Sequence, residues 1–154
     1  MIEITNNNVL FVDDEELILA KIERKLNKED FTMFFANSGR EALRILKENE
    51  IAVIVIDLSM PKVNGIKLLK MINHDYPDLV KIIFSSYSDS QTMISALYSG
   101  DVYHYISKGI VNRDEGYKIE FIPVIKRAIE RYNLIKENSR LKKGVIKAGL
   151  SLEG

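Results

Sequence analysis

The sequence contains no cysteine, which excludes a disulfide framework, thiolate ligands for a metal and a cysteine nucleophile. It also has no excess of either charge, because 22 lysine and arginine residues balance 22 aspartate and glutamate residues. A chain without a general basic field gives no reason to expect nucleic-acid binding. No apolar run is long enough to span a bilayer, and no basic-then-apolar leader is present. We therefore expect a cytoplasmic protein that binds neither nucleic acid nor membrane.

Short apolar runs alternate with longer segments in which apolar residues recur at helical spacing. Strands are predicted at residues 9–12, 31–36, 51–56, 80–84 and 102–106. Helices are predicted at residues 15–27, 38–49, 65–73, 90–99 and 123–143. The third run has no polar residue, as expected for a central strand that is buried on both faces. The alternation predicts an α/β fold with a five-stranded, doubly wound parallel sheet of the flavodoxin-like kind and an extended C-terminal helix.

Local signals refine several of these segments. Ser38 and Glu41 form a capping-box pattern at the start of the second helix. Leu17 is one of four apolar residues that recur at helical spacing in the first helix, so we expect it on the buried face. Residues 117–121 alternate in the manner of a short extended piece, and the final helix is expected to fade at Gly144.

Polar residues follow most of the predicted strands. Asp13 and Asp14 come directly after the first strand, Asp57 after the third and Ser85 after the fourth, and Lys108 lies just beyond the fifth. The carboxyl ends of parallel strands meet at one edge of the sheet. Three carboxylates there would repel one another, and a hard divalent cation with oxygen ligands would relieve the repulsion. Each signal alone has an ordinary explanation, such as a helix cap or a solvated charge, but one edge explains all of them.

Four sequence segments in this order match a known pattern. They are Val12–Glu15, Asp57–Gly65, Phe84–Tyr87 and Tyr105–Lys108. Together they closely resemble the response-regulator receiver domain of two-component signalling, a member of the CheY-like superfamily. The resemblance covers roughly residues 8–108 and, more loosely, the final helix. It implies the receiver fold and a pocket for a divalent metal.

The resemblance also implies roles for the acidic residues. Asp57 matches the phosphoacceptor, a carboxylate that attacks a phosphoryl group as a nucleophile. Asp13, Asp14, Asp57 and the backbone carbonyl of Ser59 match the ligands of Mg²⁺ or Mn²⁺. Within that set, Asp14 matches the direct ligand and Asp13 the one that acts largely through water.

Three other residues match the family's switch. Ser85 matches the hydroxyl that turns toward the phosphoryl oxygen, and Lys108 matches the lysine that pairs with that oxygen. Tyr105 matches the aromatic residue whose rotamer reports phosphorylation, although an aromatic residue covering the core would look the same. Gly109 departs from the pattern because it stands where the family usually has proline, which leaves the position of Lys108 less firmly set. Ser86 stands where a smaller residue is usual.

These matches imply a signalling switch and not an enzyme. The phosphoryl donor would be a histidine kinase or a phosphotransfer protein, and transfer to Asp57 would depend on the divalent ion. The output would be a changed surface for an effector or for a homodimer. The dimer would form through the fourth helix and fifth strand or through the C-terminal helix.

Two alternatives belong to other classes of protein. A pseudo-receiver that no longer switches would serve as a protein-interaction scaffold, and Gly109 motivates this alternative. A flavodoxin-like cofactor binder would need a phosphate-cradling loop after the first strand. Here that loop, Asp13–Glu15, is acidic and repels phosphate, so a cofactor binder is disfavoured.

We place the receiver domain at residues 8–130 and a helical extension at residues 131–150, which would lead into an output domain. Residues 151–154 are set aside as a candidate cloning scar. Within the extension, Leu134 and Leu141 are seven residues apart and Asn138 lies between them. This spacing is typical of a short coiled-coil seam with one polar position, and a solvated terminal helix is the simpler alternative.

Overall fold

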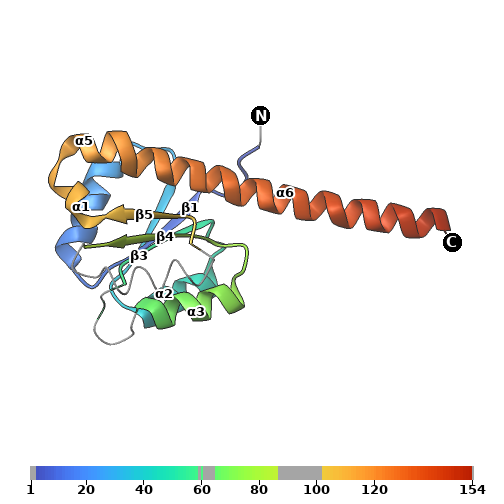
Figure 1. Ribbon diagram of the computed structural model, residues 1–154, viewed down its shortest axis with the longest axis horizontal. Coiled ribbons are helices and arrows are strands. Elements are labelled where there is room, and N and C mark those ends of the chain that lie inside the picture. Colours follow the sequence, from blue (N-terminus) through green and yellow to red (C-terminus); the bar gives the residue numbers. More distant parts are fainter. Residues whose placement is uncertain (1–2, 59, 61–64, 87–101, 154) are drawn as a thin grey trace.

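Five parallel strands form the centre of the structure, and helices lie on both sides of them (Figure 1). The computed structural model describes residues 3–58, 60, 65–86 and 102–153. The strands are β1 (Asn8–Val12), β2 (Thr32–Ala36), β3 (Val53–Ile56), β4 (Val80–Ser85) and β5 (His104–Ser107). Their order is β2-β1-β3-β4-β5, so the winding direction reverses between β1 and β3. The predicted α/β fold with a five-stranded parallel sheet is confirmed.

Helices connect and cover the strands. The first three are α1 (Glu16–Leu26), α2 (Gly39–Glu48) and α3 (Gly65–Asp75). After β5 come a 3₁₀ helix η2 (Lys108–Asn112), the single turn α5 (Asp114–Gly116), the π-helical turn η3 (Tyr117–Phe121) and the long helix α6 (Ile122–Glu153). The helix predicted at residues 90–99 lies outside the described residues.

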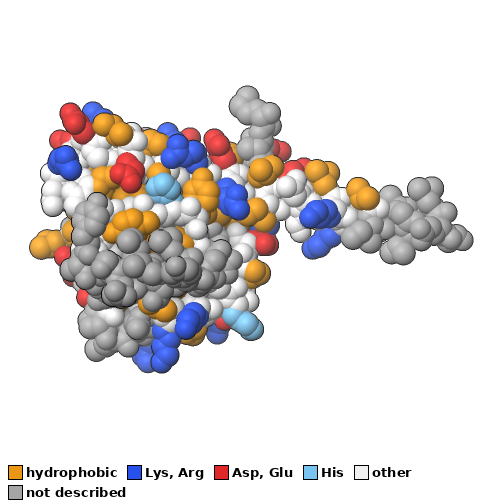
Figure 2. All heavy atoms as spheres, viewed as in Figure 1, with side chains coloured by type: hydrophobic (Ala, Val, Ile, Leu, Met, Phe, Trp, Pro, Cys, Tyr) orange, Lys and Arg blue, Asp and Glu red, His pale blue; other side chains and the backbone are white. Residues whose placement is uncertain are grey.

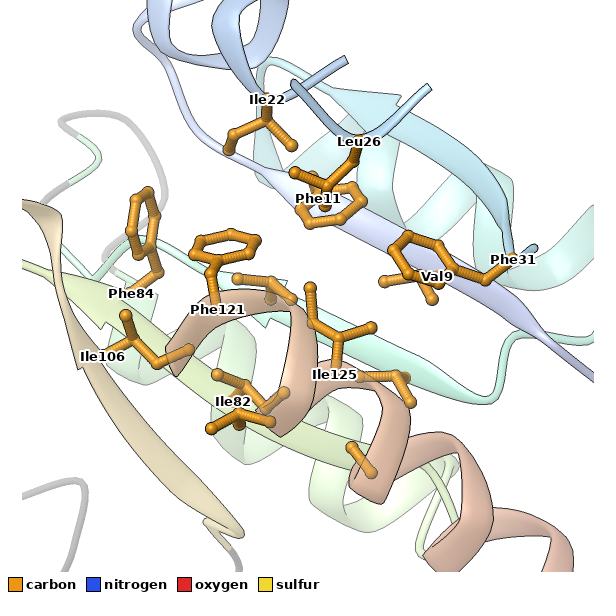
Figure 3. Packing of buried hydrophobic residues seen from close by; sticks show 14 of the residues in the cluster. Val9, Phe11, Ile22, Leu26, Phe31, Ile82, Phe84, Ile106, Phe121 and Ile125 are labelled. Atoms are coloured by element: carbon orange, nitrogen blue, oxygen red, sulfur yellow. The ribbon is translucent and has the colours of Figure 1, made fainter. Parts of the chain in front are cut away.

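One face of the sheet packs against α1, η3 and the first half of α6. Phe121 is fully buried at the centre of this cluster (Figure 3). Its ring centroid lies 5.3 Å from that of Phe84, edge to face, and 6.2 Å from that of Phe11. Aromatic pairs at such distances add to the stabilisation that burial alone provides. Phe121 therefore ties η3 and α6 to both β1 and β4.

The opposite face of the sheet packs against α2 and α3. Apolar residues of both helices enclose the alternate side chains of β1, β3 and β4. All four residues of β3 are buried, which agrees with a central strand covered on both faces. The second helix also begins as predicted, because Ser38 Oγ accepts a hydrogen bond from the Glu41 N–H at 3.2 Å.

Three local expectations were wrong. Leu17 is 86% exposed, because the buried stripe of α1 runs through Leu19, Ile22 and Leu26, which share one face at helical spacing. Residues 117–121 form a π-helical turn instead of an extended piece, and this turn places both of its aromatic ends in the core. Helix α6 continues past Gly144 to Glu153.

Helix α6 is fixed to the N-terminal edge of the sheet by Asn133, which is only 3% exposed. Its Oδ1 accepts hydrogen bonds from the backbone N–H groups of Thr5 at 2.9 Å and Asn6 at 3.0 Å. Its Nδ2 donates to the carbonyls of Asn6 and Ile129, each at 2.8 Å. Beyond this point α6 projects away from the sheet (Figure 1). In the described part of the chain, no helix has both the length and the apolar character needed to cross a membrane.

Asn133→Ala is expected to lower the free energy of unfolding by about 2–3 kcal/mol, because it leaves partly buried backbone N–H groups without their acceptor. Urea denaturation followed by circular dichroism measures this change. The control is Glu130→Ala, an exposed position on the same helix, which should change stability by less than about 0.5 kcal/mol. Equal effects of the two substitutions would contradict an anchoring role for Asn133.

Candidate functional site

The pairing of β1 with β3 brings two aspartates to the same edge of the sheet. Val12 pairs with Ile56, so Asp13 and Asp57, the next residues, leave the sheet side by side. The Asp57 N–H donates to the Val12 carbonyl at 2.9 Å, and the Asp13 N–H donates to the Ala36 carbonyl at 3.1 Å. Both aspartates are only 1% exposed. This edge is the carboxyl end of the strands at the reversal of strand order, where sites of such sheets occur.

Four carboxylates gather at this edge. Each of Asp13, Asp14, Glu15 and Asp57 offers an oxygen, and these oxygens lie within 4.8 Å of one another. Asp14 and Asp57, which come from different strands, are thus close enough to share one ion. Glu15 was not among the predicted site residues, although it follows Asp14 directly in the Val12–Glu15 segment. The predicted carbonyl ligand of Ser59 lies outside the described residues.

Lys108 places its ammonium group among these carboxylates. Its Nζ lies 2.9 Å from Asp13 Oδ2, 2.9 Å from Glu15 Oε1 and 3.0 Å from Asp57 Oδ2. Burial acts to lower the pKa of Lys108, but the hydrogen bonds to the three carboxylates outweigh it, so the pKa is raised. Lys108 therefore carries a full positive charge at neutral pH and partly neutralises the pocket.

One lysine does not neutralise the pocket completely. Burial raises the pKa of Asp13 from its usual 3.8 to about 6, and the charge of Asp57 adds to the increase, whereas hydrogen bonds from Glu15 and Lys108 oppose it. Because the ionised form of Asp13 is disfavoured, a cation that binds beside it would stabilise that form. The donor atoms are all carboxylate oxygens, which suit a hard divalent ion. The residues present therefore fit Mg²⁺ or Mn²⁺.

Ser85 is the last residue of β4, and Tyr105 lies within the neighbouring strand β5. Ser85 is fully buried, and the Tyr105 hydroxyl donates a hydrogen bond to the Ser85 carbonyl at 3.0 Å. The two strands pair in parallel, with Ile83 opposite Tyr105 and Ser85 opposite Ser107. The half-buried ring of Tyr105 packs on the cluster that α2 and α3 cover. A movement of Ser85 would therefore directly alter the hydrogen bond that Tyr105 donates.

Two glycines near the site differ in what they require. A Cβ on Gly65 would lie 2.4 Å from the Leu58 Cα, so only glycine lets α3 begin against the backbone that follows Asp57. A Cβ on Gly109 would meet only Ser107 Oγ, at an ordinary 3.7 Å. The described surroundings therefore do not require glycine at 109. Gly109 also does not keep Lys108 out of the pocket, which was the concern raised by the sequence.

Comparison with known proteins identifies the family. A family profile described as the response regulator receiver domain matches residues 9–119. The chain belongs to the response-regulator receiver family. Receivers are modules of two-component response regulators, and an acidic pocket with phosphorylation and Mg²⁺ binding is characteristic of the family. The predicted resemblance is thereby confirmed.

Curated relatives of this receiver are longer response regulators. It is 31% identical over 133 residues to the hydrogenase transcriptional regulatory protein HoxA of Cupriavidus necator, covering 86% of this chain and 26% of HoxA. It is 33% identical over 141 residues to the putative response regulator NtrX-like of Rickettsia felis, covering 90% of this chain and 28% of the relative. The receiver therefore spans about a quarter of these relatives.

A solved structure supports the same assignment. The crystal structure of a response regulator receiver domain protein from Clostridium thermocellum matches with a TM-score of 0.71 and 30% identity. The match covers 83% of this chain and 98% of the other chain. Sequence and fold therefore place the chain in one family.

Asp13→Asn is expected to stabilise the receiver at neutral pH in the absence of metal. Because the pKa of Asp13 is about 6 in the folded state and 3.8 as the usual value, the folded protein holds a proton that the unfolded chain releases. The resulting stability is present below about pH 4 and is lost as pH rises through about 6. The wild type should thus lose up to about 3 kcal/mol relative to Asp13→Asn between these limits.

Urea unfolding in EDTA across this pH range measures the difference. Asp30→Asn, an exposed aspartate, serves as the control and should track the wild type at every pH. A constant difference between Asp13→Asn and the wild type would show that Asp13 does not titrate in this range.

Proposed function

We propose that this receiver is a phosphorylation switch in which Asp57 accepts a phosphoryl group from a histidine kinase or a phosphotransfer protein. The observation that carries the proposal is the pairing of the buried Asp57 carboxylate with Lys108 at 3.0 Å inside a cluster of four carboxylates. A negatively charged phosphoryl group can approach the Asp57 carboxylate in such a pocket only if cations offset the negative charge of both groups. Lys108 is one cation, and a divalent ion held by the acidic residues is the other.

In the proposed transfer, an Asp57 carboxylate oxygen attacks the phosphorus of a phosphohistidine. The new O–P bond forms as the P–N bond breaks, and the bonding electron pair returns to the imidazole of the partner. Phosphoryl transfer depends on positioning and charge neutralisation more than on covalent chemistry. Lys108 would exchange its bond to Asp57 Oδ2 for a bond to a phosphoryl oxygen and thus hold the product in place.

The carboxylates of Asp13, Asp14 and Asp57, with the predicted carbonyl of Ser59, would hold Mg²⁺ or Mn²⁺. When bound, the ion supplies positive charge that offsets the phosphoryl oxygens. Glu15 lies within the same cluster and currently pairs with Lys108, so it would compete with the phosphoryl group for the lysine. The departure of Lys108 from Glu15 is thus a part of the proposed switch.

The remaining part of the proposed switch is the Ser85–Tyr105 pair. The Ser85 hydroxyl would turn toward the phosphoryl oxygen and donate a hydrogen bond to it. Because the Tyr105 hydroxyl is bonded to the carbonyl of the same residue, that movement would weaken the tie and free the ring to change its rotamer. The charge added by phosphorylation would then alter the shape of the protein surface beside β5.

We also propose that the chain is not an enzyme for an external substrate. Its chemistry would be limited to its own phosphorylation and slow loss of the phosphoryl group. The pseudo-receiver scaffold is not favoured, because Lys108 occupies the pocket despite the glycine that follows it. The output would pass to an effector, to an output domain or to a second copy of the chain. Of the two predicted dimer surfaces, the fourth helix lies outside the described residues, and α6 is described.

Asp57→Asn is expected to abolish labelling by acetyl phosphate, because an amide is not a nucleophile for phosphorus. The wild type should label only with Mg²⁺ or Mn²⁺ present, and Asp14→Asn should require at least about tenfold more metal. Intact-protein mass spectrometry measures the added phosphoryl group. The control is Asp75→Asn, an exposed aspartate at the end of α3. Labelling of Asp57→Asn at the wild-type level, or of neither protein, would refute the proposal.

Tyr105→Phe is expected to favour the phosphorylated conformation, because it removes the hydrogen bond to the Ser85 carbonyl. A bond worth about 1 kcal/mol corresponds to roughly fivefold tighter binding of beryllofluoride with Mg²⁺. Changes in amide resonances near Ser85 report this binding. Tyr76→Phe, a tyrosine at the opposite end of the sheet, is the control. Unchanged affinity in Tyr105→Phe would show that the hydroxyl does not restrain the switch.

A further inference from the structure

A hollow at the amino ends of β4 and β5 lies at the edge of the sheet opposite the acidic pocket. Its volume is about 330 Å³, which is enough to hold a small ligand. The segment before β4, the start of β4, the segment before β5 and α6 all contribute to its walls. None of its lining residues has a part in the proposed switch. The lining includes Leu79, Val80, Lys81, Tyr103, Arg131 and Ile135.

Contacts between the strands and α6 fix the walls of this hollow. The Tyr103 N–H donates to the Lys81 carbonyl at 2.8 Å, so the segment that enters β5 follows the start of β4. The side chain of Tyr103 packs against the apolar cluster that α6 covers. The guanidinium carbon of Arg131 lies 5.6 Å from the centroid of the Tyr103 ring, a distance at which a cation and an aromatic face attract each other. The ring therefore orients the guanidinium group beside the hollow.

Lys81 places a buried positive charge in the wall. It is 3% exposed and is the only charged residue of β4, whose other residues are apolar except for Ser85. A lysine that only covers apolar surface extends its ammonium group into bulk water, which Lys81 does not do. Its Nζ donates to the Pro77 carbonyl at 3.4 Å, and this acceptor is neutral. Because an apolar residue would fill the position at lower cost, the lysine indicates a role beyond packing.

The charges of the lining favour an anion. Lys81 and Arg131 are both positive, and the acidic residue in the described lining is Asp78. Asp78 Oδ2 pairs with Lys136 Nζ at 3.2 Å, and Lys136 lies outside the described lining. The negative charge of Asp78 is thus offset from outside, whereas both positive charges remain at the wall. Figure 2 shows several Lys and Arg side chains along α6, so an anion would approach a basic surface.

We propose that this hollow binds a small organic anion, a carboxylate or a phosphate monoester that carries a short apolar body. The planar guanidinium group of Arg131 can donate two parallel N–H groups to an oxyanion. The ammonium group of Lys81 adds a compact charge, and the oxyanion would join the partners that Lys81 already has. Leu79, Val80 and Ile135 provide apolar surface for the body of the ligand.

The bound anion would hold three parts of the structure together. It would contact Lys81 at the start of β4, Tyr103 before β5 and Arg131 on α6. Arg131 and Ile135 flank Asn133, the residue that ties α6 to the segment before β1. Occupation of the hollow would therefore stiffen α6 at the point where it leaves the sheet. The hollow would be an effector site that is separate from the acidic pocket.

Small molecules with one benzene ring and different charges test the preference for anions. Phenyl phosphate, benzoate, benzyl alcohol and benzylamine are each titrated at neutral pH into the isotope-labelled full chain. EDTA is present, so the metal-free acidic pocket repels the two anions. Changes in the amide resonances of Tyr103 and Ile135 report binding. At least one anion should bind with a dissociation constant on the order of 1 mM, as ligands of this size do, and benzyl alcohol should bind at least about tenfold more weakly. Benzylamine should not bind.

Variants of the two cations test which residues hold the anion. Lys81→Met keeps the length of the side chain and should weaken anion binding at least about tenfold, because a buried charge is lost. Arg131→Met should weaken it at least about threefold. The matched control is Arg127→Met, which removes the same charge from an exposed position one turn earlier on α6 and should change the affinity less than about twofold. Circular dichroism shows whether each variant folds, and the exposed Arg131 decides the matter if Lys81→Met does not.

The combined outcomes decide the proposal. Binding of both anions supports a site for oxyanions in general, binding of phenyl phosphate alone supports a phosphorylated ligand, and binding of benzoate alone supports a carboxylate. Neither anion binding at about tenfold the expected dissociation constant, or benzyl alcohol binding equally well, would overturn it. So would unchanged affinity in either variant that folds. Asp57→Asn should leave anion binding unchanged, which separates this test from that of phosphorylation.

Discussion

The ion-pair cluster around Lys108 is the interaction on which the rest of the site depends. The register between β1 and β3 places Asp13 and Asp57 side by side in a nearly dry environment, where like charges cost the most. Lys108 offsets part of this cost by contacting both aspartates and Glu15. The pocket therefore keeps an excess of negative charge, because one lysine faces four carboxylates. Such a pocket is more stable with a cation added, and its lysine can change partners when an anion arrives.

The backbone that carries Lys108 is part of the same cooperative unit as the core. Lys108 is the first residue of η2, whose Ile110 and Val111 are buried with Phe121. A Cβ on Gly116 would lie 2.3 Å from Ile110 Cγ1, so η2 and the turn that follows it pack as closely as a glycine permits. The close packing leaves little room for η2 to shift without moving η3 and the start of α6. A change at Lys108 thus has a direct mechanical route to α6 through packed side chains.

Sequence reasoning could predict the parts of the structure that depend on strong, short-range patterns. The ends of the first and third apolar runs located Asp13 and Asp57, and Lys108 lies two residues beyond the fifth run, because the residues that follow parallel strands come to one edge of the sheet. The role of Leu17 was misjudged because several apolar residues shared the first helix, and only packing decides which stripe is buried. The π-helical turn at residues 117–121 was missed because an alternating pattern also fits a turn whose two ends both enter the core. Glu15 was missed because its contact with Lys108 spans 93 residues of sequence.

The sheet connects the acidic pocket at the carboxyl ends of its strands with the point at their amino ends where α6 leaves it. The pocket needs β1 and β3 to end together, and α6 runs back across the same sheet to leave at the edge where the strands begin. Asn133 then ties α6 to the segment just before β1, so the strand that presents Asp13 is joined at its other end to α6. If α6 were attached loosely, it could neither transmit nor resist a conformational change in the receiver domain. Since it is bonded to the backbone that enters β1 and packed through Phe121 on β1 and β4, its direction is set by the strands that hold the pocket. Any rearrangement that moves these strands must therefore move the projecting helix as well.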